Sequence, residues 1–191
     1  MEEKSYYDRI FEGLDYADTE FCGREFESCT FLDCIFSDSN LSQNTFTDCR
    51  FQSCNMSTAL FSNTSLRNVD FRACKLTGVD FGNCNAFLFS VTFEQCRLDY
   101  SVFFKNALRN SRFADCIIHE AGFIESDLSG AVFHDCDLLN SVFIRSNLRG
   151  ADFRTANNYS IDPAGNRIEN AQFSYPGVLG LLDAYDIVVE Y

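Results

Sequence analysis

Ten cysteines are the residues of this 191-residue chain best suited to chemistry, because thiols ligate metals, form disulfides and act as nucleophiles. No two of them show the CxxC spacing of zinc sites. The two histidines, His119 and His134, have no cysteine placed beside them as a nucleophile. The cysteines instead follow a rhythm: Cys29 and Cys34 are five residues apart, and each precedes a phenylalanine by two residues.

A five-residue repeat of large apolar residues runs through most of the chain. It begins at Phe11, continues to Phe81, resumes two residues out of phase at Leu88 and ends at Phe153. A small residue stands two positions before most of these large ones. A period of five fits neither an α-helix at 3.6 residues nor a strand at two. The repeat predicts a chain that turns a corner every five residues and points two side chains inward on each side.

Longer columns show how many sides each coil has. One phenylalanine column is spaced by 20 residues with a single step of 22, and a cysteine column has the same spacing and the same step. These columns are Phe11, Phe31, Phe51, Phe71, Phe93, Phe113, Phe133, Phe153 and Phe173, and Cys34, Cys54, Cys74, Cys96, Cys116 and Cys136. Four sides per coil predict an all-β, four-sided solenoid. Stacking at about 4.8 Å gives roughly nine coils and a rod roughly 40 Å long.

The same register explains the cysteines. All except Cys22 occupy the small inward position. In-register stacking leaves neighbouring Cβ atoms about 4.8 Å apart, beyond the roughly 3.5–4.5 Å of a disulfide. We therefore expect cysteine to act as a small buried filler, with ten reduced thiols, no bound metal and no cofactor.

Composition narrows the function. The formal net charge is −13, which argues against nucleic acid and anionic membranes as partners and favours a basic protein surface. The acidic start has no apolar run typical of a signal peptide, so we expect a cytoplasmic protein. There is no Gly-rich phosphate loop, no HExxH motif and no catalytic constellation. We expect the protein not to be an enzyme.

Charged residues fall on particular walls when the repeat is put in register. The wall of the Leu66, Leu108 and Leu148 column carries three arginines, Arg67, Arg109 and Arg149, with Lys105 and Arg145 nearby. Acidic residues gather on the walls of the Phe31 and Leu98 columns. They are Asp33, Asp38, Glu94, Asp99, Asp115, Glu120, Asp135, Asp137 and Asp152. Acidic faces and one basic face are expected, either as a binding surface or as solvated charge that keeps the rod soluble.

Both ends and one internal seam depart from the repeat. We expect residues 1–10 to cap the start, residues 11–173 to form the solenoid, and residues 82–92 to form a bulge that carries the extra Phe87 and Phe89. Residues 174–191 predict a short helix, starting near Ser174 and Pro176, and then a short strand. Their apolar residues either hold a dimer together or fold back as a cap. The expected dimerisation residues are Val178, Leu179, Leu181, Leu182, Tyr185, Ile187 and Val189.

The repeat resembles the pentapeptide-repeat family over residues 11–173, which implies a right-handed quadrilateral β-helix. The tail, NNYSIDPAGNRIENAQFSYPGVLGLLDAYDIVVEY, looks like the C-terminal segment of Qnr-type topoisomerase-protecting proteins, with the pattern NY-x-ID…N-x-I…A-x-FS-x-P. That resemblance implies a homodimeric rod that mimics DNA, binds DNA gyrase or topoisomerase IV, and protects them from quinolones or other poisons. Like charge supports the mimicry, because DNA carries one negative charge per about 1.7 Å.

The resemblance also suggests which residues meet the topoisomerase. The expected acidic face comprises Asp33, Asp38, Glu94, Asp99, Asp115, Glu120, Asp135 and Asp137. Some members of that group carry a long projecting loop needed for protection, and here only the two-residue seam is available. Self-immunity against a topoisomerase-directed toxin fits the sequence as well as drug resistance does. A structural or adaptor pentapeptide protein without a topoisomerase partner is the alternative.

Overall fold

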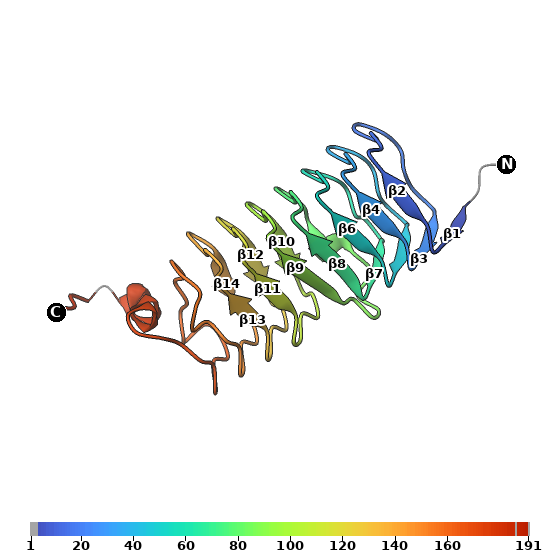
Figure 1. Ribbon diagram of the computed structural model, residues 1–191. Coiled ribbons are helices and arrows are strands. Elements are labelled where there is room, and N and C mark those ends of the chain that lie inside the picture. Colours follow the sequence, from blue (N-terminus) through green and yellow to red (C-terminus); the bar gives the residue numbers. More distant parts are fainter. Residues whose placement is uncertain (1–3, 186, 191) are drawn as a thin grey trace.

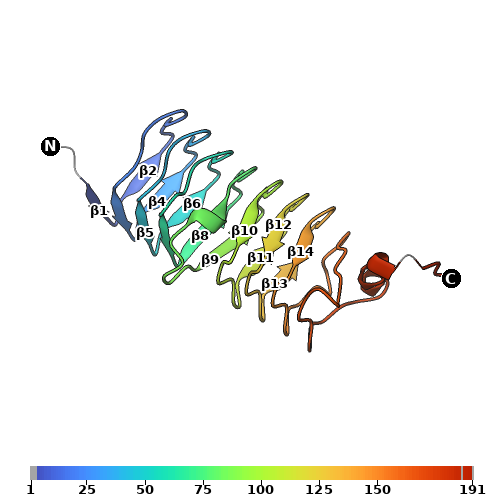
Figure 2. The ribbon, with the colours of Figure 1, turned by 180° about the vertical axis from the view of Figure 1, so that it is seen from behind.

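The computed structural model describes residues 4–185 and 187–190 and shows a rod of stacked parallel coils, with the two ends of the chain at opposite ends of the rod (Figures 1 and 2). Each coil has four walls, which we name after a residue of their inward column: the Phe31, Leu98, Phe123 and Leu148 walls. All strand pairs are parallel, and the partners are one coil apart. The four-sided β-solenoid expected from the sequence is confirmed.

Three of the walls carry short strands. The Phe31 wall has seven: β2 (Ile10–Glu12), β4 (Thr30–Leu32), β6 (Arg50–Gln52), β8 (Val69–Arg72), β9 (Val91–Glu94), β11 (Arg112–Ala114) and β13 (Val132–His134). The Leu148 wall has β1 (Ser5–Tyr7), β3 (Glu25–Glu27), β5 (Thr45–Thr47) and β7 (Ser65–Arg67). The Phe123 wall has β10 (Val102–Phe104), β12 (Gly122–Ile124) and β14 (Val142–Ile144). On the Leu98 wall single bridges join the coils, for example Ile117 to Asp137.

The corners are formed by residues in the left-handed backbone region, one every five positions along most of the chain. Aspartate, asparagine and glycine take this conformation at low cost, which explains their frequency there. Asp33, Asp115 and Asp135 have φ between 50° and 53°. Each corner residue points its side chain outward and places the next inward pair against the core.

Phenylalanine rings form a continuous ladder through the core. Neighbouring rings of the Phe31 column stack with centroids 4.7–5.5 Å apart, from Phe11 to Phe173. Rings of the Phe123 column meet them edge-on; Phe113 and Phe123 lie 6.0 Å apart at 87°. Such pairs add about 0.5–1.5 kcal/mol each beyond the burial of apolar area. The ladder therefore spans nine coils, two more than the seven-stranded sheet.

Cysteine, serine, threonine and asparagine at the small inward position donate hydrogen bonds to backbone carbonyls. The thiol of Cys54 donates to the Phe31 carbonyl at 3.4 Å, and that of Cys74 donates to the Phe51 carbonyl at 3.3 Å. Ser126 donates to the Phe103 carbonyl in the same way, at 2.9 Å. Cysteine here fills space and donates to a carbonyl, of the preceding coil for Cys54 and Cys74 and of its own coil for Cys116 and Cys136. Burial raises the pKa of the Cys49 thiol to about 12, so it stays protonated at neutral pH.

Native thiol labelling should separate the cysteines by burial. Cys22 is exposed, Cys84 is partly exposed and the other eight are buried. Ellman's reagent at pH 8 should therefore label Cys22 rapidly and Cys84 slowly, and in denaturant it should find all ten thiols. Cys22→Ser should remove the fast phase alone. Fast reaction of several thiols in the folded protein, or six or fewer thiols after denaturation, would contradict the filler role.

The seam lies where expected, but its register differs from the prediction. The 3-10 helix η1 (Phe81–Asn83) is capped by Asp80, whose carboxylate accepts from the Gly82 N–H at 2.8 Å. Leu88 was expected to resume the inward series. It is instead 61% exposed at a positive φ of 58°, while Phe89 is 5% exposed and joins the core. The two extra residues are absorbed in the turn before Phe89, which moves the inward side chain by one position.

The two ends also differ in part from expectation. Residues 1–10 were expected to form a separate cap, but β1 pairs in register with β3 and Tyr6 stacks on Phe26 at 5.0 Å, so this segment builds a first rung. Residues 1–3 of that expected cap lie outside the described residues. The expected C-terminal helix is a pair of 3-10 turns, η2 (Gly177–Leu181) and η3 (Asp183–Tyr185). The strand expected at 187–189 is irregular chain.

Candidate acidic interaction face

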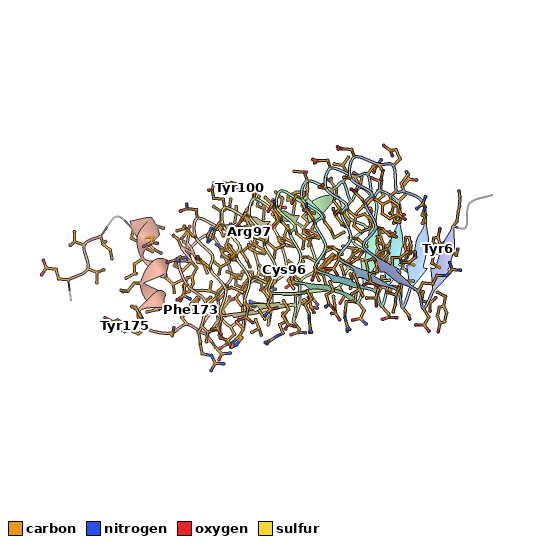
Figure 3. The ribbon with its side chains drawn as sticks, turned by 45° about the horizontal axis from the view of Figure 1, so that its top comes forward. Tyr6, Cys96, Arg97, Tyr100, Phe173 and Tyr175 are labelled. Carbon is orange, nitrogen blue, oxygen red and sulfur yellow. The ribbon has the colours of Figure 1, made fainter. Side chains whose placement is uncertain are left out.

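The Leu98 wall is flanked by two corners rich in carboxylates. Asp33, Asp115 and Asp135 stand at its corner with the Phe31 wall, and Asp38 and Glu120 at its corner with the Phe123 wall. All five are exposed. We call these five residues the acidic face. Their left-handed corner positions direct these side chains outward. Figure 3 shows the side chains of the rod, with Tyr6 near one end and Phe173 near the other.

Within residues 4–185 and 187–190, no lysine or arginine forms an ion pair with these five carboxylates. Glu120 accepts a hydrogen bond from the Tyr100 hydroxyl at 3.1 Å. Asp135 lies 3.2 Å from His134 Nε2. Lys75 and Arg97 line the same surface pocket as Asp115 but form no ion pair with it. The five carboxylates thus face solvent without a paired lysine or arginine, and a basic partner would interact with their charge directly.

Two residues expected on this face are already neutralised. Glu94 forms an ion pair with Arg72 of the preceding coil at 2.7 Å. Asp99 is only 6% exposed; it binds Arg97 Nε at 2.7 Å and accepts the His119 backbone N–H at 3.2 Å. Asp99 stabilises the wall instead of offering charge to a partner. Fewer than the expected eight carboxylates therefore present unpaired charge at the surface.

Asp137 holds an intermediate position on the Leu98 wall. His119 Nε2 lies 2.8 Å from one of its oxygens, and the Asn158 amide donates to the other at 2.8 Å. Partial burial alone would raise the pKa of Asp137, but the hydrogen bonds from Asn158 and His119 outweigh it and lower that pKa. Asp137 thus stays ionised and ties three successive coils together.

The basic column expected on the Leu148 wall is largely compensated. Arg109 Nε binds Asp127 at 2.5 Å, and Arg149 binds Glu169 at 2.8 Å. The Arg67 guanidinium lies 5.6 Å from the centre of the exposed Phe87 ring, and its Nε is buried without a hydrogen-bond partner. Most of the positive charge on this wall is therefore neutralised by carboxylates, whereas the charge of the acidic face is not neutralised by lysine or arginine.

The C-terminal segment covers the last coil and leaves apolar side chains outside. The Gly180 carbonyl accepts the Ile161 N–H at 3.0 Å, and Leu181 packs against the core. Val178, Tyr185, Ile187 and Val189 are 38%, 50%, 55% and 43% exposed. Leu179 and Leu182 are partly buried. The segment thus forms a cap through one set of residues and presents a second set to solvent.

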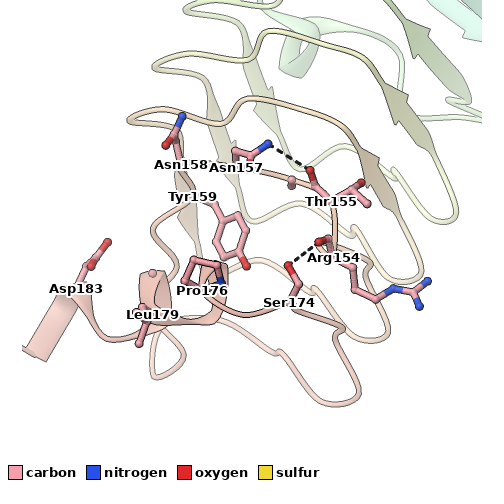
Figure 4. Close-up of a pocket in the computed structure, with 12 residues that line it drawn as sticks. Arg154, Thr155, Asn157, Asn158, Tyr159, Ser174, Pro176, Leu179 and Asp183 are labelled. Atoms are coloured by element: carbon pink, nitrogen blue, oxygen red, sulfur yellow. Dashed lines mark hydrogen bonds between the residues drawn. The ribbon is translucent and has the colours of Figure 1, made fainter. Parts of the chain in front are cut away.

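A pocket of about 440 Å³ separates this cap from the last coil (Figure 4). Tyr159 lines it; its ring packs at 5.5 Å from Phe153 and 5.8 Å from Phe173. The Ser174 hydroxyl donates to the Arg154 carbonyl at 2.6 Å. The Tyr159 hydroxyl is buried without a hydrogen-bond partner, and burial raises its pKa. Gly177 and Gly180 are required here because a Cβ at either position would collide with Tyr159.

Across the described part of the chain, no three His, Cys, Asp or Glu side chains gather as a metal site would require. Nor does any helix there have the length and apolarity to cross a membrane. The candidate functional features among the described residues are the surface carboxylates and the C-terminal segment.

The structure defines a class of protein: a four-sided parallel β-solenoid built from five-residue units, with exposed carboxylates along its corners. Two family models match the chain, one for a pentapeptide repeat region over residues 24–103 and one for pentapeptide repeats (8 copies) over residues 121–157. Together they cover more than half of it. The chain belongs to the pentapeptide-repeat family.

Solved structures match the fold at low sequence identity. A trypsin-treated variant of QnrB1, a plasmid-mediated fluoroquinolone resistance protein, is 22% identical, with 98% of this chain and 100% of that chain covered and a TM-score of 0.55. HetL from the cyanobacterium Nostoc sp. strain PCC 7120, involved in heterocyst differentiation regulation, is 11% identical, with 90% and 89% covered and a TM-score of 0.58. No curated protein sequence matches the chain.

Proposed function

We propose that this protein is a non-enzymatic, cytoplasmic DNA mimic that binds DNA gyrase or topoisomerase IV and protects it from quinolones or other poisons. The acidic face is the observation that carries the proposal: two groups of outward corner carboxylates, Asp33 with Asp38 and Asp115 with Glu120 and Asp135, which no described lysine or arginine pairs. A DNA-binding surface is basic and shaped for a rod with regularly spaced negative charge. The rod offers the same sign at lower density, so it mimics DNA only in part.

Two likenesses support this partner class. The tail resembles the C-terminal segment of Qnr-type proteins, and QnrB1, whose fold this chain shares, is a fluoroquinolone resistance protein. HetL shares the fold as well and has a different described role, so the fold alone does not select the partner. An adaptor role without a topoisomerase is therefore the second candidate. Competition tests the difference: the protein should displace DNA from purified gyrase, whereas an adaptor would leave DNA binding unchanged.

We further propose that the exposed apolar residues of the C-terminal segment hold a homodimer together. Val178, Tyr185, Ile187 and Val189 are among the residues of the segment that the last coil does not cover. Exposed apolar groups of this kind mark interfaces, and two-fold pairing is the commonest closure. A dimer would join two acidic rods end to end and lengthen the surface offered to a topoisomerase.

Two variants separate the cap from the interface. Ile187→Ser with Val189→Ser should give a soluble monomer, because neither side chain covers the last coil. Deletion of residues 176–191 should cause aggregation, because it also removes the Gly180 contact with Ile161 and uncovers the Tyr159 and Phe173 rings. Light scattering at micromolar concentration reads both results. A parent protein that is already monomeric at micromolar concentration would contradict the dimer proposal.

A further inference from the structure

The outer surface of the Phe123 wall differs from the other three walls in the C-terminal half of the rod. Strands β10, β12 and β14 align in register and present two outward columns. The first column is Val102, Gly122 and Val142, and the second is Phe104, Ile124 and Ile144. Phe104, Val142 and Ile144 are 41%, 46% and 43% exposed. Gly122 is buried. We call the other five residues the apolar array. Outward positions of the same coils on other walls carry charges, such as Arg112 and Arg149.

The array has a defined shape. A Cβ added at Gly122 would meet nothing closer than 3.5 Å, so packing does not require glycine there. Its φ is not positive, so backbone conformation does not require it either. Gly122 is itself buried, because the Ile124 side chain lies 3.5 Å from the place of its Cβ, so it adds no exposed surface between Val102 and Val142. Phe104 is held in place beside it: Gly82 leaves room for its Cβ, and the Lys105 ammonium lies 4.8 Å from its ring centre.

The surroundings indicate what kind of partner fits. One edge of the array adjoins the corner that carries Glu120, two residues before Gly122, so the array is continuous with the acidic face. Along the other edge, Glu125 binds both Lys105 at 3.5 Å and Arg145 at 2.7 Å. These three residues together give that edge a net charge of +1. A partner that covers both walls must combine basic groups with apolar side chains.

We infer that the apolar array and the acidic face form one L-shaped interface for the same topoisomerase, whose apolar side chains pack on the exposed Phe104, Val142 and Ile144. This inference rests on the proposed function and adds a second contact surface to it. The two walls have different tasks. Exposed carboxylates speed association and make it salt-dependent, whereas buried apolar contacts slow dissociation.

Kinetics of binding to immobilised gyrase at several salt concentrations test this division. The double variant Phe104→Ala with Ile144→Ala should speed dissociation about tenfold, as truncation of a central interface contact does, and each single variant should speed it by less. The association rate and its salt dependence should not change. Ala107→Gln, at an exposed outward position of the Leu148 wall in the same part of the rod, is the matched control and should bind like the parent.

Each outcome decides between the two claims. Circular dichroism and melting should match the parent, because these side chains lie outside the core. If the parent binds gyrase and the array variants dissociate at the parent rate, the array is not part of the interface, while the proposed function stands. A change confined to association would also overturn the division of tasks. If the parent chain shows no binding at all, the proposed function fails and this inference fails with it.

Discussion

Replacement of Asp115, Glu120 and Asp135 by lysine is expected to slow association with gyrase roughly tenfold at low salt and to abolish competition with DNA. The three carboxylates are exposed and have no lysine or arginine partner, so their reversal removes attraction and adds repulsion toward a basic surface. Asp115 and Asp135 stack in adjacent coils about 4.8 Å apart, inside the roughly 8 Å Debye length at physiological salt. The salt dependence of association should weaken in parallel.

The fold should tolerate this triple variant. Lys105 and Arg145 already occupy left-handed corner positions, with φ of 58° and 49°. A matched control replaces Glu25, Glu27 and Asp48 of the Leu148 wall by lysine. Both triple variants raise the formal charge of the chain from −13 to −7, so only the location of the charge differs. If the two variants compete with DNA equally well, net charge and not the acidic face would determine binding.

Phe113→Ala is expected to lower the free energy of unfolding by about 3–5 kcal/mol, the typical cost of removing a buried phenylalanine. Phe113 is fully buried and stacks on Phe93 and Phe133 at 5.1 and 4.8 Å. It also meets Phe103 and Phe123 edge-on at about 6 Å. The interlocking rings limit how far neighbouring coils can collapse into the cavity, which places the cost at the upper end of core truncations.

Arg112 provides the control within the same strand. It precedes Phe113 in β11 and its side chain is exposed, so Arg112→Ala should change the free energy of unfolding by no more than about 0.5 kcal/mol. Urea melts of the two variants measure the difference. Equal losses would mean that inward and outward positions have been assigned incorrectly along this wall.

The sequence predicted the core because the repeat determines it locally. In a chain that turns every five residues, each inward residue lies a constant number of residues from the nearest corner. Inward residues of one wall, such as Phe31, Phe51 and Phe71, therefore recur every 20 residues. The 20-residue columns then give the stacking directly. The acidic corners were predictable for the same reason, since Asp33 and Asp135 follow an inward phenylalanine by two residues.

Side-chain ion pairs could not be predicted in this way. Arg97 neutralises Asp99 within one coil, and Arg109 neutralises Asp127 of the next coil, because of side-chain directions that the repeat number does not encode. At the seam, the extra residues could enter at several positions, and only packing selects Phe89 over Leu88 for the interior. In the tail, the fit of Gly180 against Tyr159 favours a tight 3-10 turn.

Gyrase supercoiling, titrated with this protein in the presence and absence of a quinolone, tests the central claim most directly. A DNA mimic that protects the enzyme should restore supercoiling in the presence of the drug at protein concentrations that leave uninhibited gyrase active, and should inhibit supercoiling at higher concentrations by displacing DNA. The acidic triple variant should do neither, and the Leu148-wall control should behave like the parent. If the parent protein neither restores supercoiling nor competes with DNA for gyrase or topoisomerase IV at any concentration, the account is contradicted.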